Sequence, residues 1–173
     1  MLLRAARDSI EAAFMHKTVY VPPRIRKSPA FSQQPGVFVT LLKKKELRGS
    51  VGYPEGTYPL IDAAVRAARD AAFTDPRFKP VKKNELPQLR IRIDILSKFK
   101  ATNVKGIKAG KDGIYIKFGV FSALQLPEDA RKFKWTAKEI VENTLRKAGL
   151  APEMWNDTNL RIYKFTAKAF QEE

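Results

Sequence analysis

The sequence predicts an α+β protein in which a largely antiparallel sheet is flanked by helices. Two segments, LRIRIDILS (89–97) and GKDGIYIKFG (110–119), alternate apolar and polar residues, which is the pattern of half-buried antiparallel strands. Segments with helical spacing surround them, and no repeat, low-complexity stretch or Gly/Ser linker divides the chain. Its 173 residues are 44% hydrophobic, so one compact domain is expected, which buries roughly 70% of the unfolded chain's surface.

Three helices are predicted from apolar spacing and from their end signals. The first is amphipathic and spans about residues 2–14. The second opens at Pro59, ends before Pro76 and carries a stripe of alanines, which indicates a close approach to whatever it covers. The third follows a capping box formed by Thr136 and Glu139.

The remaining segments are predicted as strands or loop. GVFVTLL (36–42) is β-branched and apolar, so we expect a strand buried on both faces inside the sheet. The two alternating segments are expected to pair as neighbours, and NLRIYKF (159–165) reads as the last strand. Residues 21–35 hold four prolines and are expected to form an extended loop without helix.

The segment ELRGSVGY (46–53) is expected to form a further strand of special interest. Period two would place Leu47, Val51 and Tyr53 on one face and Arg48 and Ser50 together on the other. If that face is accessible, a guanidinium and a hydroxyl point into one hollow. Such a pair suits an anionic group.

Composition limits the possible chemistry. The chain has one histidine and no cysteine, which excludes disulfides, thiol nucleophiles and Cys/His metal clusters. The sequence indicates no metal site and no cofactor. Charged residues interrupt every apolar run, so we expect no signal peptide and no membrane segment, and hence a soluble cytoplasmic protein.

The net charge of +15 favours anionic partners, because a basic surface attracts phosphates over long range. RNA or DNA is therefore a possible partner, although lysine-rich surfaces also serve solubility. The candidate contacts lie in the basic N-terminal third of the chain: Lys43, Lys44, Lys45, Arg24 and Arg26.

Several ordered motifs resemble the AMMECR family, whose domain was first named from a human AMME-syndrome candidate region. They are GVFVTL, LRGSVG, DPRF (75–78), an EL before the Ile-rich strand, GIYI, LP (126–127) and KAGL (147–150). The resemblance covers roughly residues 2–172. It implies one α+β domain of two unequal subdomains, of which the larger holds both termini. It implies no established activity, although prokaryotic relatives are often associated with radical-SAM and Memo-type proteins.

The chain departs from the usual signature, Leu-Arg-Gly-Cys-Ile-Gly, at two positions. Ser50 stands where cysteine is usual and Val51 where isoleucine is usual. A serine needs a neighbouring base to act as a nucleophile, and the sole histidine, His16, is expected to settle at the end of the first helix. The segment 91–94 also departs from the family's usual Glu-containing form, which leaves the role of a carboxylate there open.

The candidate ligand-binding residues combine the signature with DPRF and the preceding strand: Arg48, Gly49, Ser50, Gly52, Arg77, Thr40 and Asp75. In the functional interpretation, Arg48 and Arg77 share an anion. In the structural interpretation, the glycines mark a bulge or a close approach of another backbone, and Arg48 pairs with a carboxylate such as Asp75. Three function classes stay open: an anion-binding domain that also contacts RNA or DNA, an enzyme for a small phosphorylated or carboxylated substrate, and a protein-interaction adaptor.

Overall fold

The computed structural model describes residues 1–173, and the chain divides into two compact units. The first unit comprises residues 1–96 and 168–173, and therefore holds both chain ends. The second comprises residues 97–167. Each unit holds its own helices and most of a four-stranded sheet, which confirms the α+β class.

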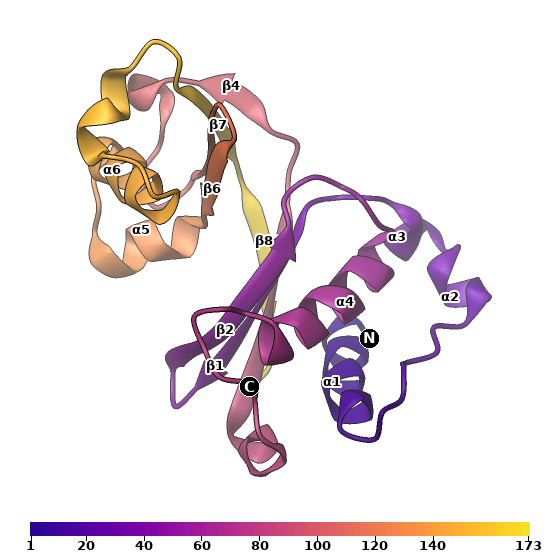
Figure 1. The fold of residues 1–173 in the computed structure, drawn as a ribbon. Coiled ribbons are helices and arrows are strands. Elements are labelled where there is room, and N and C mark those ends of the chain that lie inside the picture. Colours follow the sequence, from indigo (N-terminus) through magenta and orange to yellow (C-terminus); the bar gives the residue numbers. More distant parts are fainter. The chain divides into compact units, whose positions relative to one another are not determined.

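In the first unit, two helices cover one face of the sheet (Figure 1). The strand order is β2-β1-β3-β8, and β1 pairs antiparallel with both β2 and β3. The strands are β1 (Val37–Lys43), β2 (Glu46–Tyr53), β3 (Leu89–Leu96) and β8 (Ala167–Gln171). The covering helices are α1 (Leu2–Ala13) and α4 (Leu60–Phe73). Both α1 and α4 lie on the same face of the sheet, and because side chains alternate along a strand, every second residue points to the opposite face.

Small side chains allow α4 to lie close to the sheet. The stripe of alanines that the sequence shows is buried along its whole length: Ala63, Ala64, Ala67, Ala68, Ala71 and Ala72. They pack against a core of valines, leucines and isoleucines from β1 and β3. The predicted close approach of this helix is therefore confirmed.

The second unit repeats the plan of one sheet with helices on one side. Its antiparallel strands follow the order β4-β7-β5-β6. They are β4 (Lys100–Thr102), β5 (Gly113–Phe118), β6 (Phe121–Gln125) and β7 (Arg161–Phe165). The helices are α5 (Pro127–Phe133) and α6 (Ala137–Lys147), and α6 packs its apolar side on β5 and β6. The predicted capping box is present, with the Glu139 carboxylate accepting from the Thr136 N–H at 2.8 Å.

Three short 3₁₀ helices complete the chain: η1 (Lys83–Gln88), η2 (Val104–Gly106) and η3 (Pro152–Asn156).

Four sequence-based predictions of the fold are wrong in detail. The prolines of the expected loop begin two short helices, α2 (Pro23–Arg26) and α3 (Pro29–Ser32), because proline suits the first position of a helix. The segments 89–97 and 110–119 lie in different sheets and do not pair. β1 is buried on one face only. The last strand is β8, whose small and polar residues lack an alternating pattern.

Candidate functional site

The signature LRGSVG lies on β2, the edge strand of the first sheet, and contains a β-bulge. Leu41 pairs with Gly49 and Leu42 pairs with Leu47, so Arg48 is the extra residue between them. One extra residue reverses the alternation of the strand. Leu47, predicted on the same face as Val51, is consequently 43% exposed.

Both glycines of the signature are needed for packing. A Cβ at Gly49 would lie 2.1 Å from the carbonyl oxygen of Ala71, so α4 approaches β2 too closely for any side chain. A Cβ at Gly52 would lie 2.4 Å from the ring of Phe38, which covers the glycine from the neighbouring strand. The structural interpretation of these two residues therefore has a direct physical basis.

Arg48 is held inside the first unit by Glu85, and not by Asp75 as expected. Its Nε and Nη2 donate to the two carboxylate oxygens of Glu85 at 3.1 and 3.0 Å. Its other nitrogen donates to the carbonyl of Lys79 at 3.0 Å, and its side chain is only 17% exposed. Lys43 donates to the same carboxylate at 2.8 Å.

The hydrogen bonds from Arg48 lower the pKa of Glu85 most strongly. Burial opposes them, and the bond from Lys43 adds to them, so that the pKa falls to about 2. Glu85 is thus a carboxylate at any ordinary pH. Most of the donor capacity of Arg48 is used by this carboxylate and the nearby carbonyls, so we do not count Arg48 among the residues that contact a ligand.

The DPRF segment binds the open edge of β2 at Ser50. The backbone N–H of Ser50 donates to Asp75 at 2.8 Å, and the carbonyl of Ser50 accepts from Arg77 at 3.1 Å. Arg77 in turn donates to both oxygens of Asp75, at 2.9 and 2.7 Å. An ion pair therefore satisfies backbone groups that an edge strand would otherwise leave unpaired.

Asp75 is almost completely buried, yet it stays ionised. Burial by itself would raise its pKa, but the bonds from Arg77 and from the backbone N–H of Ser50 outweigh burial and lower the pKa to about 2. Arg77 keeps 47% of its side chain exposed. The two arginines expected to share an anion are thus paired with two different carboxylates.

The side chain of Ser50 lies on the face of the sheet opposite to α1 and α4. Its neighbours Gly49 and Val51 face α4 and the core, so alternation directs Ser50 to the other side. Its hydroxyl is 3.0 Å from the hydroxyl of Thr40, which is directly opposite on β1. On the next strand, Arg92 is the cross-strand partner of Thr40.

These three residues, Ser50, Thr40 and Arg92, form a polar row across β2, β1 and β3. Arg92 donates to both oxygens of Asp94 at 3.0 Å, and Asp94 is fully buried. Sequence reasoning named Ser50 and Thr40 but not Arg92 or Asp94. The alternation of LRIRIDILS, which places both on the face opposite to Ile91 and Ile93, was the signal that could have found them.

The structure gives Ser50 no base. The hydroxyl of Ser50 shares its hydrogen bond with the hydroxyl of Thr40, while Asp75 accepts from the backbone N–H of Ser50 instead. His16 is exposed in a left-handed conformation after α1, with a φ of 53°. No group of three or more His, Cys, Asp or Glu side chains is arranged to hold a metal ion.

The cations predicted to contact nucleic acid have different surroundings. Arg26 forms an ion pair with Asp62 at 2.8 Å, and Lys43 is held by Glu85. Arg24 is exposed on α2. Lys44 and Lys45 form the exposed two-residue turn between β1 and β2, both with positive φ.

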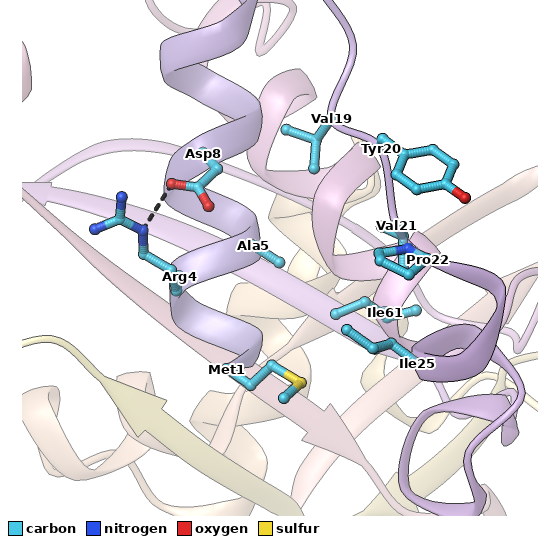
Figure 2. Close-up of a pocket in the computed structure, with 10 residues that line it drawn as sticks. All are labelled: Met1, Arg4, Ala5, Asp8, Val19, Tyr20, Val21, Pro22, Ile25 and Ile61. Atoms are coloured by element: carbon cyan, nitrogen blue, oxygen red, sulfur yellow. Dashed lines mark ion pairs between the residues drawn. The ribbon is translucent and has the colours of Figure 1, made fainter.

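A small apolar pocket lies on the helix side of the same unit, away from the polar row (Figure 2). It encloses about 180 Å³ between α1, α2 and the start of α4, and Figure 2 shows the ion pair of Arg4 with Asp8 beside it. It brings together none of the predicted site residues. No helix is long and apolar enough to span a membrane.

Comparison with known proteins agrees with this architecture. The model of the AMMECR1 family matches residues 3–170. The chain belongs to the AMMECR1 family. A protein of Thermococcus kodakarensis is 37% identical over 99% of this chain and 89% of its own length. One of Methanothermobacter thermautotrophicus is 39% identical, over 99% and 93%.

A solved structure shows the same fold. The crystal structure of an uncharacterized protein from Pyrococcus horikoshii superposes with a TM-score of 0.93 at 35% identity, covering 99% of this chain and 90% of that one. The AMMECR1 match spans both units, so the family domain includes the polar row and the whole second unit.

Proposed function

We propose that this AMMECR1 domain binds a small anion, a phosphate or a carboxylate, at the polar row, through the hydroxyls of Ser50 and Thr40. Two hydroxyls in contact can both turn their protons toward an acceptor. Arg92 in the same row is held by both oxygens of Asp94 and its side chain is 13% exposed, so we do not count it among the ligand contacts. Arg77, which is 47% exposed at the edge of β2, supplies positive charge near Ser50.

One observation carries the proposal. Within LRGSVG, packing or pairing accounts for Arg48, Gly49, Val51 and Gly52. Of its two polar side chains, Arg48 is paired with Glu85, whereas the hydroxyl of Ser50 contacts only the hydroxyl of Thr40 among the hydrogen bonds of the structure. A polar residue at that position is therefore best explained by something it binds.

Phosphate and succinate are suitable probes, added to the full chain at constant ionic strength against sodium chloride. A ligand that binds only the folded state raises the melting temperature as its concentration rises. We expect this rise to be lost in the double variant Thr40→Val with Ser50→Ala. The exposed Ser32→Ala, on α3, is the matched control and should respond as the unmodified protein does.

Two outcomes would contradict the proposal. One is a melting temperature that chloride raises as much as phosphate or succinate does, because that response comes from screening alone. The other is a double variant that keeps the full response.

No specific contact favours an enzyme that acts on a small phosphorylated or carboxylated substrate, because the hydroxyl of Ser50 has no base beside it. No specific contact favours a protein-interaction adaptor either. Contact with RNA or DNA through Lys44, Lys45 and Arg24 stays a prediction. It is separated from small-anion binding by its steep dependence on salt.

A further inference from the structure

The end of α5 in the second unit presents an aromatic side chain surrounded by cations. Phe133 is the last residue of α5 and is 54% exposed. Its ring stacks on Trp135, with centroids 5.0 Å apart and planes inclined by 23°. Trp135 packs against the core of the second unit. An exposed ring is therefore held in a fixed orientation by a ring that is anchored.

The chain between α5 and α6 reads Lys132-Phe133-Lys134-Trp135, so basic and aromatic residues alternate there. Lys132 places its ammonium 5.3 Å from the centre of the Phe133 ring. Lys134 is exposed and ends α5 in a left-handed conformation, with a φ of 54°.

A second segment adds positive charge beside α5. Arg131 donates to the carbonyl of Gly110 at 3.2 Å, which holds the loop before β5 against the helix. That loop contributes two exposed lysines, Lys108 and Lys111. The acidic groups nearby are already engaged, because Glu128 pairs with Arg131 at 2.6 Å and Asp112 accepts from the backbone of Lys108.

We propose that this surface, defined by Phe133, Lys132, Lys134, Lys108 and Lys111, binds single-stranded RNA or DNA. An unpaired base stacks on the ring of Phe133, and the lysines contact the flanking phosphates. Aromatic rings among basic residues bind single strands in this way because every base has a flat face and every nucleotide a negative charge. Bases inside a duplex are already stacked and cannot reach the ring.

This inference is independent of the proposed small-anion site, which lies in the first unit. The two have different ligands, different residues and different responses to salt. Loss of one activity leaves the other unaffected, so their failures are distinguishable.

The test is fluorescence anisotropy of the full chain with labelled oligo(U) and oligo(dT). We expect binding at low salt that weakens steeply at moderate salt. Phe133→Ala should weaken it about 10-fold, the loss that follows from removing one stacked base. Phe121→Ala is the matched control, because Phe121 is 47% exposed in the same unit but has no stacking partner in its surroundings. It should bind as the unmodified protein does.

A second pair of variants separates position from total charge. Lys132→Gln with Lys134→Gln removes the same charge as Lys17→Gln with Lys27→Gln, which changes two exposed lysines of the first unit that belong to no proposed contact. We expect a several-fold greater loss from the first pair. Circular dichroism melts check that all variants fold, which their exposure favours.

The proposal is overturned by any of three results: no binding of either oligonucleotide at low salt, equal affinity of the Phe133→Ala and Phe121→Ala variants, or equal affinity for a duplex of the same length. Binding to anionic phosphatidylserine vesicles without binding to oligonucleotides would also overturn it, and would assign the surface to a membrane.

Discussion

The two units carry nearly the same net charge but use their charged side chains differently. The first unit has 19 basic and 11 acidic residues, and the second has 14 and 7. In the first, buried or half-buried carboxylates are held by arginines, as Glu85, Asp75 and Asp94 are. In the second, the ion pairs of α5 and α6 have exposed cations, Arg131 and Lys138, while the carboxylate of Asp112 is buried.

The comparison shows that net charge alone does not locate a binding surface. In the first unit, arginines such as Arg48 and Arg77 stabilise strands and loops, so a good part of the unit's basic character serves structure. In the second unit, lysines surround an exposed ring with few carboxylates in contact. Stability measurements can test this difference, because both tryptophans, Trp135 and Trp155, lie in the second unit and their fluorescence reports the unfolding of that unit separately.

The largest effect is expected at Gly49. Gly49→Ala would place a methyl group 2.1 Å from the Ala71 carbonyl, so α4 must move away from β2, at a cost of about 3 kcal/mol in the free energy of unfolding. Urea unfolding followed by circular dichroism measures this. The control is Gly149→Ala, which has open space but a φ of +78° and should cost only about 1 kcal/mol. Equal losses would refute the close approach as the reason for Gly49.

The next effect concerns Glu85. Glu85→Gln leaves Arg48 and Lys43 without their carboxylate in a partly buried setting, and we expect a loss of about 2 to 3 kcal/mol. Glu142→Gln, which removes the carboxylate 3.6 Å from the exposed Lys138 in the second unit, should cost less than about 0.5 kcal/mol. If both variants unfold at the same urea concentration, the contrast between the units is wrong.

Acid should destabilise the first unit before the second. The pKa values of Asp75 and Glu85 are about 2 in the folded protein, below their ordinary values of 3.8 and 4.5. The unfolded chain therefore binds protons first as the pH falls. The stability that these carboxylates contribute is fully present above about pH 4.5 and is lost progressively toward pH 2. The loss is about 2 kcal/mol for each of them.

Urea unfolding at a series of pH values measures this loss. Asp75→Asn should flatten the dependence between about pH 4 and pH 2, because the variant has no carboxylate at that position to protonate. A variant that keeps the full slope would show that Asp75 is not the group responsible. If the second unit is less sensitive to acid, the urea midpoint measured by tryptophan fluorescence should change less with pH than the midpoint measured by circular dichroism.

The sequence predicted the α+β class, the three long helices and the capping box, because each depends on local spacing and local hydrogen bonds. It did not predict that 89–97 and 110–119 belong to different sheets, since partners of a strand are chosen by the whole chain. The bulge at Arg48 was not predicted either, because it also depends on contacts with distant parts of the chain. Nothing in ELRGSVGY itself shows that α4 would require Gly49, or that Glu85, 37 residues from Arg48 along the chain, would hold that arginine.

The candidate site was predicted in part. Four of the predicted residues do meet around β2: Ser50, Thr40, Asp75 and Arg77. However, Asp75 and Arg77 bind the backbone of Ser50 and not its side chain, which a sequence pattern does not reveal. The nucleic-acid prediction concentrated on the N-terminal lysines because composition favoured them. Composition cannot show that two of those five cations are already paired.

The smallest effect is expected at the turn between β1 and β2, where two lysines adopt a backbone conformation that is unfavourable for lysine. Lys44 and Lys45 have φ values of 52° and 69°, the left-handed region that Asn and Gly adopt at least cost in a two-residue hairpin. Lys44→Asn with Lys45→Gly should therefore stabilise the first unit by about 1 kcal/mol. The urea midpoint by circular dichroism should rise while the tryptophan signal stays in place. A lower urea midpoint would mean that contacts of the two lysines stabilise the first unit by more than the backbone strain costs. The surface lysines of the first unit would then differ less from its structural arginines than the comparison of the two units assumes.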